Sequence, residues 1–296
     1  MKLFEGGAMP GVGPIHIDEI NPTLSVLEKK LGIDLINNAL GSVGKKEFSG
    51  DIDVALQIEP DAIPEFVEKL KKLPEILDIA KSSVIMTKVK IENFDQNKTT
   101  SKPRTGYVQI DFMPGDPGWM KTYYHSPSDK ESKYKGVFRN LMIATICAIY
   151  QRNDSEETID DGRPVESERW MWSPTDGLVR IKRTPVPKKN GEGYTKKNNN
   201  EIINKPIKDA NGIAKGLGLD SAADLNSYES LKAAIEKNYA PEMVDKILTG
   251  FAKNGTVQDI GVPDDLNNEE LDRIKELSGL NLNSTVMAGN GIRMNK

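Results

Sequence analysis

The chain has 296 residues, of which 37% are hydrophobic and 28% are charged, and its net charge at pH 7 is -4. This length suits one or two domains with a sizeable core. No segment approaches the roughly 18 consecutive apolar residues of a membrane-spanning helix, and no signal-peptide core is present, so we expect a cytoplasmic protein with no membrane partner. One cysteine and two histidines are too few for an internal disulfide or a structural zinc site, so any metal must be held by carboxylates.

The N-terminal half of the chain combines helix and strand patterns. Glycine and proline are frequent in residues 1–20, which predicts an irregular lead-in. Asn21 can cap a helix with Pro22 in its first turn, and leucines at helical spacing continue the pattern through residues 22–31. The later patterns predict, in chain order, strands at residues 33–40 and 52–56, a helix at 62–72, and strands at 84–91 and 107–113 joined by a polar loop.

The second half of the chain separates its charges. A broad apolar face predicts a long core helix at residues 130–150. Residues 153–168 have a net charge of -6 and residues 178–210 a net charge of +6, while Asp176-Gly177 between two strand patterns predicts a hairpin. Residues 185–200 are rich in Lys, Asn and Gly and predict a mobile loop or linker. Shorter helical patterns follow at residues 224–238, 241–252 and 268–277.

Two aspartates stand two residues apart at the start of the strand predicted at residues 52–56. Asp51 and Asp53 therefore share one face, while Ile52 points to the other. Asp111 lies in a second apolar strand pattern, where an inward-facing acid is unfavourable unless a metal or a hydrogen-bond network compensates it. Because Mg²⁺ takes oxygen ligands, the three carboxylates predict a site for two divalent ions.

Candidate phosphate ligands stand close to these acids in the sequence. Gly41 permits a tight loop and a close backbone approach, and Ser42 with the neighbouring backbone N–H groups can bind phosphate oxygens. Lys45 and Lys46 lie in the same loop, ahead of Asp51. Their ammonium groups can meet a triphosphate or remain solvated, and the sequence leaves both possibilities open.

Basic residues also follow the third acid. Lys133, Lys135 and Arg139 lie on or enter the helix predicted at residues 130–150, with Lys135 and Arg139 four apart and hence on one face. They can clamp phosphates or form a solvated helix face. The basic segment 180–208 can follow a nucleic-acid backbone, although a solubilising linker is the favoured interpretation of its composition.

Three features together resemble a known enzyme superfamily. These are Gly41-Ser42, a spacing of eight residues to Asp51-Ile52-Asp53, and Asp111 between apolar neighbours. They resemble the nucleotidyltransferase superfamily, which includes DNA polymerase β, CCA-adding enzymes and poly(A) polymerases, and the N-terminal block also looks like nucleotidyltransferases encoded by bacteriophages, which act in the host cytoplasm. The resemblance covers roughly residues 35–115.

The resemblance implies an α+β fold, with a nucleotidyltransferase-like mixed sheet, flanking helices and a mostly helical C-terminal region. We expect three parts along the chain. They are a catalytic domain at residues 1–125, a helix and hairpin extension with a basic linker at 126–210, and a small helical region at 211–296.

The resemblance also implies a division of roles. Asp51 and Asp53 would bind two Mg²⁺ ions, Asp111 would complete the site and help to deprotonate an attacking hydroxyl, and Gly41-Ser42 would hold the phosphates of the nucleotide. The expected reaction moves an NMP from an NTP, ATP among them, to an acceptor hydroxyl and releases pyrophosphate. The acceptor stays open between RNA such as tRNA, a protein and a small molecule. The alternative is a non-catalytic nucleotide- or partner-binding regulatory protein of the same fold, such as an antitoxin or a phage component.

Overall fold

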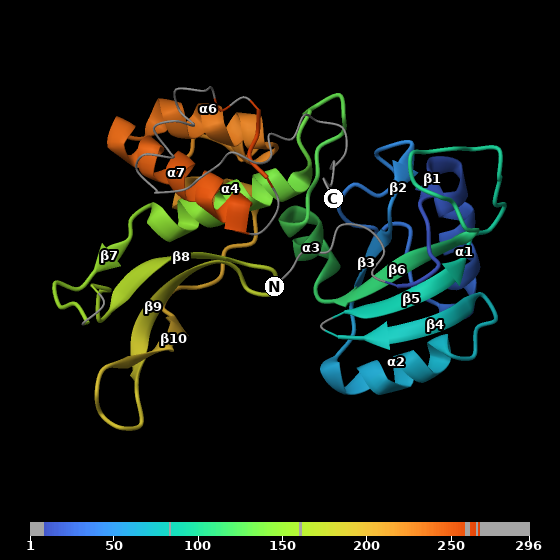
Figure 1. Cartoon of the computed structure of the whole chain (residues 1–296), viewed down its shortest axis with the longest axis horizontal. Helices are drawn as coiled ribbons and strands as arrows, with labels where there is room; N and C mark the ends of the chain where they lie inside the picture. The colour runs from blue at the N-terminus through green and yellow to red at the C-terminus, as the bar shows by residue number, and fades with distance from the viewer. Residues whose placement is uncertain (1–8, 83, 160–161, 258–260, 265, 267–296) are drawn as a thin grey trace, which may run out of the picture. The chain divides into compact units, whose positions relative to one another are not determined.

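The computed structural model describes residues 9–82, 84–159, 162–257, 261–264 and 266. The chain divides into two compact units, residues 1–136 and 137–296, and its fold class is α+β, as the sequence predicts (Figure 1). Residues 126–136 belong to the first unit, and the helices after residue 210 belong to the same unit as the hairpin strands. No helix in the described part of the chain is long and apolar enough to cross a membrane.

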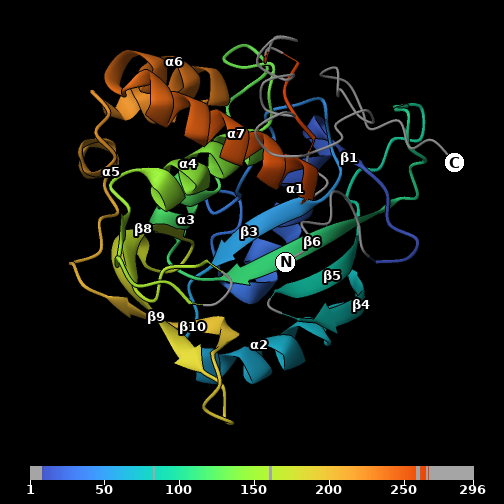
Figure 2. The ribbon, with the colours of Figure 1, turned by 60° about the vertical axis from the view of Figure 1, so that its left-hand side comes forward.

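The first unit contains a mixed four-stranded sheet in the order β3-β6-β5-β4 (Figure 2). Strand β3 (Ile52–Leu56) runs parallel to β6 (Tyr107–Pro114), whereas β5 (Ile85–Lys90) is antiparallel to β6 and to β4 (Ile76–Lys81). The other elements of this unit are β1 (Ile15–His16), α1 (Ile17–Leu31), β2 (Phe48–Ser49), the 3-10 turn η1 (Pro60–Ala62), α2 (Ile63–Leu70) and α3 (Pro117–Tyr123).

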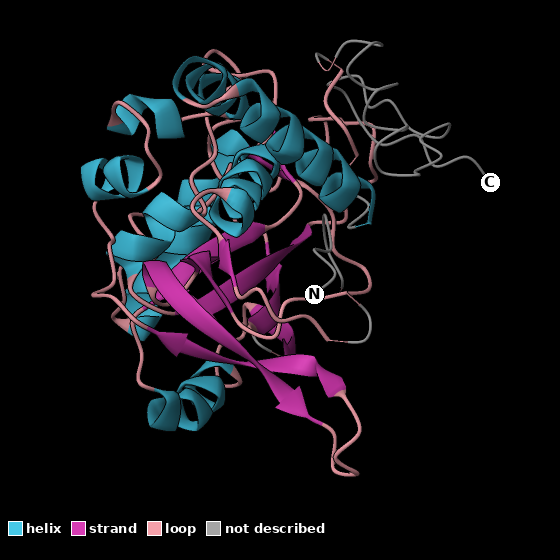
Figure 3. Ribbon diagram, turned by 90° about the vertical axis from the view of Figure 1, so that its left-hand side faces the viewer, coloured by secondary structure: helices cyan, strands magenta, loops and turns pink. Residues whose placement is uncertain are grey.

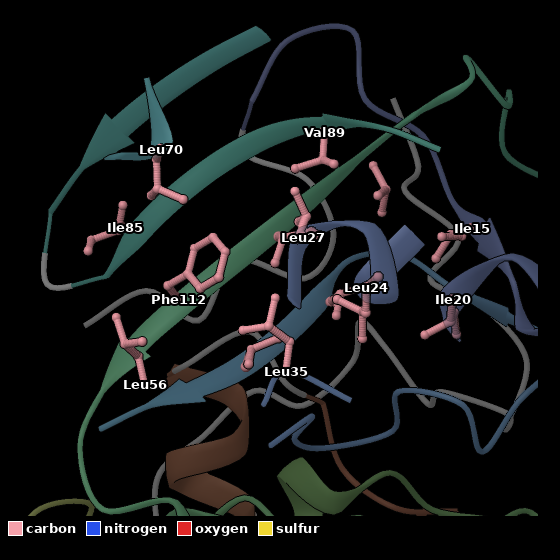
Figure 4. Packing of buried hydrophobic residues seen from close by; sticks show 14 of the residues in the cluster. Ile15, Ile20, Leu24, Leu27, Leu35, Leu56, Leu70, Ile85, Val89 and Phe112 are labelled. Atoms are coloured by element: carbon pink, nitrogen blue, oxygen red, sulfur yellow. The ribbon is translucent and has the colours of Figure 1, made fainter. Parts of the chain in front are cut away.

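Alternation along the two parallel strands decides where the core of this unit forms. Ile52 and Val54 of β3, and Ile110 and Phe112 of β6, are fully buried. Leucines of α1 and α2 pack onto this face of the sheet (Figure 4), and Phe66 of α2 meets the Phe112 ring edge-on at 5.4 Å between centroids. Each fully buried apolar side chain contributes about 1.5–3 kcal/mol to folding. The residues between these apolar positions are left on the opposite face.

Helix α1 begins five residues earlier than the Asn21-Pro22 signal predicts. His16 is its N-cap, because the Nδ1 atom accepts a hydrogen bond from the Asp18 N–H at 3.2 Å and the Glu19 carboxylate accepts one from the His16 N–H at 3.1 Å. Pro22 therefore lies inside the helix, where it removes one backbone hydrogen bond. The predicted start was wrong because this reciprocal capping starts the helix first.

Most of the other helices and strands predicted for the first unit are present in the structure, and one predicted strand is not. The helix at 62–72 and the strands at 84–91 and 107–113 are confirmed by α2, β5 and β6. Residues 33–40 form no strand, and Ala39 makes only an isolated antiparallel bridge to Val54. The loop between β5 and β6 is fixed by a buried ion pair between Arg104 and Glu19, and Arg104 also donates to the Asp95 carbonyl at 2.7 Å.

The second unit contains an antiparallel sheet in the order β10-β9-β8-β7, together with helices. Its strands are β7 (Asn153–Asp154), β8 (Ser167–Ser173), β9 (Gly177–Pro187) and β10 (Tyr194–Ile202), and its helices are α4 (Gly136–Ile149), α5 (Ala210–Gly216), the 3-10 turn η2 (Ala222–Leu225), α6 (Tyr228–Asn238) and α7 (Pro241–Val257). The three helices α4, α6 and α7 meet at an aromatic cluster of Phe138, Tyr228 and Phe251, with centroids 5.2–6.5 Å apart.

The structure confirms the hairpin at Asp176-Gly177, which joins β8 to β9, and the helices predicted at 224–238 and 241–252. The linker predicted at residues 185–200 is wrong. Strands β9 and β10 pair through this segment and form a long hairpin (Figure 3), because Gly191 and Gly193 adopt positive φ angles in the connecting turn. The helix predicted at 268–277 lies outside the described residues.

Candidate active site

The three aspartates singled out in the sequence gather at β3 and β6. Asp53 and Asp111 are direct partners in the parallel pair, so their side chains leave the same face of the sheet, on strands about 4.8 Å apart. Asp51 immediately precedes β3, and its charge acts on both of the other carboxyl groups. Ile52 and Val54 point into the core, so the acids lie on the face opposite to it.

The electrostatics of this face are unfavourable without a cation. The pKa of Asp53 is raised to about 7, mainly by burial and additionally by the negative charges of Asp51 and Asp111. Burial also raises the pKa of Asp111 to about 6, against a hydrogen bond from Gln109 that lowers it. Carboxylates of like charge therefore share a partly desolvated position, which favours neutralisation by a bound cation or a proton.

The Gly41-Ser42 loop lies beside Asp53 because the preceding residues pair with β3. The Leu40 N–H donates to the Asp53 carbonyl at 2.9 Å, and the Ala55 N–H donates to the Asn38 carbonyl at 2.9 Å. Gly41 has a φ of +64°, and a Cβ atom there would lie 4.0 Å from the Asp53 Oδ2 atom. Glycine is thus required by the left-handed backbone rather than by lack of space. The chain turns next to the carboxylate.

Helix α3 and the residue after it form one wall of the site. Met120 of α3 packs with Leu40 and Ala55, and Tyr124 packs against the same cluster. The Tyr124 backbone carbonyl lies 4.0 Å from the position of a Cβ atom on Gly41. Burial and the charge of Asp53 raise the pKa of the Tyr124 hydroxyl. Nothing in the sequence pattern marks Tyr124, because α3 was not predicted and only the tertiary structure brings this segment to β3.

Gln109 is a second residue that the sequence analysis missed. Its Nε2 atom donates to the Asp111 Oδ1 atom at 2.9 Å, and its Oε1 atom accepts from the Met9 N–H at 3.0 Å. The Gln109 side chain is buried, so both contacts are held in place. Gln109 stands two residues before Asp111 and shares its face, a spacing that could have marked it as a positioning residue.

Lys45 and Lys46 tie the loop after Gly41-Ser42 to a later segment of the same unit. The Lys45 Nζ atom donates to the Ser126 carbonyl, and the Lys46 Nζ atom forms an ion pair with the Asp129 carboxylate at 2.7 Å. Both ammonium groups thus fix the loop in this structure. A role for them in phosphate binding stays a prediction.

The basic residues after the third acid differ in their surroundings. The Lys133 ammonium lies 4.8 Å from the centre of the Tyr134 ring, and Lys135 is exposed. Helix α4 begins at Gly136, so Lys135 and Arg139 do not share a helical face as predicted. Arg139 is buried in the second unit, where its Nε atom donates to the Leu225 carbonyl and connects α4 to η2. These contacts give Arg139 a packing role.

A divalent cation matches the chemistry of the donor set. In the described part of the chain no three His, Cys, Asp or Glu side chains meet closely enough to form a ready metal site. The oxygens of Asp51, Asp53 and Asp111 are nevertheless the hard ligands that Mg²⁺ prefers. Their mutual repulsion is the interaction that a cation would relieve. These three residues therefore fit the group that the sequence motif implies.

Comparison with known proteins adds a structural likeness. No protein-family model matches the chain, and no curated protein matches it. The ternary P/T complex of Leishmania infantum polymerase beta is 14% identical with a TM-score of 0.40, over 73% of this chain and 77% of that chain. The ternary gap complex of the same polymerase is 16% identical with a TM-score of 0.42, over 73% and 71%. The chain is similar in structure to polymerase β.

Proposed function

We propose that this chain is a Mg²⁺-dependent nucleotidyltransferase, which moves an NMP from an NTP to an acceptor hydroxyl and releases pyrophosphate. One observation carries the proposal. Asp53 and Asp111 are register partners on adjacent parallel strands, with Asp51 within electrostatic reach and the Gly41 turn beside Asp53. Such a carboxylate cluster next to a turn that allows close backbone approach suits a metal-bound triphosphate.

Each residue then has a stated task. Asp51, Asp53 and Asp111 would hold Mg²⁺, which when bound supplies charge neutralisation for the triphosphate and lowers the pKa of an attacking hydroxyl. Asp111 keeps one oxygen in the hydrogen bond with Gln109, which leaves the other free of that contact to accept the hydroxyl proton. The Gly41-Ser42 turn offers backbone N–H groups and the Ser42 hydroxyl to phosphate oxygens.

The electrostatics of Asp53 favour this assignment over a purely structural role for the acids. A structural carboxylate lowers the free energy of the folded state through ion pairs or hydrogen bonds, whereas burial and like charges raise the pKa of Asp53. Groups with strongly raised pKa values and charged neighbours concentrate at functional sites. This supports a ligand-binding role for the three acids.

The experiment that tests the proposal measures transfer of label from each of the four α-labelled NTPs, with Mg²⁺, to cellular RNA, protein and small molecules. Wild-type protein should label one acceptor class, and Asp53→Asn should abolish labelling while retaining the fold by circular dichroism. Asp61→Asn, an exposed carboxylate of η1, serves as the matched control and should label like wild type. Equal labelling by wild type and Asp53→Asn would overturn the assignment.

A further inference from the structure

A cluster of three arginines in the second unit has no role in the proposed reaction. Ser167 pairs with Asp154 on one side and with Arg183 on the other, so these three residues form one row on the same face of the sheet. Arg169 lies two residues from Ser167 and therefore leaves the same face. Arg152, just before β7, places its Nε atom 2.6 Å from the Asp154 carboxylate. We call Arg152, Arg169 and Arg183 the arginine cluster.

The arginine cluster is short of acceptors. The buried Nε atoms of Arg169 and Arg183 have no hydrogen-bond partner among the described residues. Burial lowers the pKa of Arg169, and the charges of Arg183 and Arg152 lower it further, which places the three guanidinium groups within electrostatic reach of one another. Asp154 already pairs with Arg152. Its charge also acts on Arg183, so one carboxylate faces three guanidinium groups. The half-buried groups of Arg169 and Arg183, whose Nε atoms lack acceptors, are unfavourable there unless an anion binds them.

The opposite face of the same strands shows the contrast. Lys182 lies next to Arg183 in the chain but on the other face, where its Nζ atom pairs with Glu166 at 3.1 Å. Arg180 lies 5.7 Å from the centre of the Trp170 ring on that face. The cations there have partners within the unit. The shortage of acceptors is therefore specific to the arginine cluster and is not a general property of this basic sheet.

The surroundings of the arginine cluster favour a polymer of phosphates over a single ion. Strand β9 runs from the cluster into the long hairpin that it forms with β10 (Figures 1 and 3). Lys188, Lys189, Lys196 and Lys197 lie at or near the turn of this hairpin. Residues 178–210 have a net charge of +6. Arg183 and Lys188 are five residues apart, or about 16 Å along an extended strand, which exceeds the size of one phosphate ion. One guanidinium group can bind a phosphate group through two parallel N–H···O hydrogen bonds.

We propose that the arginine cluster binds the phosphate backbone of a nucleic-acid strand, which the lysines of the β9–β10 hairpin then follow. The guanidinium groups of Arg152, Arg169 and Arg183 would donate hydrogen bonds to phosphate oxygens. Binding at this site requires no chemistry at Asp53, so the proposal stands independently of the transferase activity. Protein surfaces that bind single-stranded nucleic acid through a basic groove typically cover roughly 4–16 nucleotides.

The test measures fluorescence anisotropy of a labelled single-stranded oligonucleotide of about 20 nucleotides, as RNA and as DNA, with full-length protein. Arg183→Gln and Arg169→Lys should weaken binding about tenfold, and Arg183→Gln should reduce the slope of log affinity against log salt by about one. The matched control is Lys182→Gln on the opposite face, which should weaken binding by no more than about twofold. Asp61→Asn, at an exposed carboxylate of η1, should bind like wild type. Thermal unfolding of each variant establishes that it is folded.

The outcomes separate the alternatives. Equal weakening by Arg183→Gln and Lys182→Gln would overturn the site, because binding would then depend on overall charge. A thermal stabilisation by inorganic phosphate that Arg183→Gln removes, without any oligonucleotide binding, would assign the arginine cluster to a free phosphate and overturn the nucleic-acid backbone as its ligand. Loss of oligonucleotide binding in Arg183→Gln but not in Lys182→Gln is the expected result.

Discussion

The substitution Asp53→Asn should raise stability while it removes function. The pKa of Asp53 is about 7, compared with an ordinary value of 3.8. The difference is roughly three pH units, and each unit corresponds to about 1.36 kcal/mol, so ionised Asp53 destabilises the metal-free fold by at most about 4 kcal/mol. Asparagine has a similar shape without the charge. Because neighbouring groups relax around the charge, the actual penalty in wild type is smaller than this limit. We therefore expect the variant to be more stable than wild type by about 1–3 kcal/mol at pH 8.

The sign of the pH dependence follows from the same pKa. The raised pKa means that the folded protein binds a proton more tightly than the unfolded chain between about pH 4 and pH 7. The contribution of Asp53 to stability is therefore complete below pH 4 and is lost as the pH rises through 7. Asp111, with a pKa of about 6, adds a smaller change of the same sign. The variant should lose the larger part of this dependence.

Urea unfolding in a chelator, at pH 5 and pH 8, measures the effect. The advantage of Asp53→Asn over wild type should be larger at pH 8 than at pH 5. Added Mg²⁺ should raise the unfolding midpoint of wild type but not that of the variant, since the variant lacks the Asp53 carboxylate that would bind the ion. Asp61→Asn should follow wild type in both respects. A variant that is less stable than wild type at pH 8, or equally stabilised by Mg²⁺, would refute the reasoning.

Three further predictions follow from particular contacts. Gln109→Leu removes the donor to Asp111, so the pKa of Asp111 should rise and the acid limb of the pH–rate profile for pyrophosphate release should move to higher pH; an unmoved limb would exclude a positioning role. Glu19→Ala removes the carboxylate partner of the buried Arg104 guanidinium and should lower the free energy of unfolding by about 3–5 kcal/mol, measured by urea unfolding. Glu68→Ala, in an exposed ion pair, should leave the urea midpoint nearly unchanged. Burial raises the pKa of the Cys147 thiol, so the thiol should react with a thiol reagent only after denaturation, and rapid labelling of the native protein would contradict its burial.

The sequence alone determined the strands that carry the acids. Period-two alternation around Ile52 identified that strand and put Asp51 and Asp53 on the face opposite to Ile52. The strand around Ile110 was also identified, but Asp111 was expected to face inward, whereas it lies on the face away from the buried Ile110 and Phe112. The sequence also predicted a tight loop at Gly41, whose φ of +64° is one that a residue without Cβ adopts without strain. These inferences depend on local geometry, which the sequence specifies directly.

The tertiary structure decided everything that depends on pairing between distant segments. The partnership of Asp53 with Asp111 requires a parallel register, which no local pattern encodes. The position of Tyr124 near Asp53 and the burial of Arg139 against the Leu225 carbonyl likewise follow from packing of elements far apart in the chain. The polar run at residues 185–200 has the composition of a linker, yet it is a paired hairpin, because interstrand hydrogen bonds and two turn glycines outweigh low strand propensity. Composition describes each residue alone, whereas these features arise from partners that only the folded chain supplies.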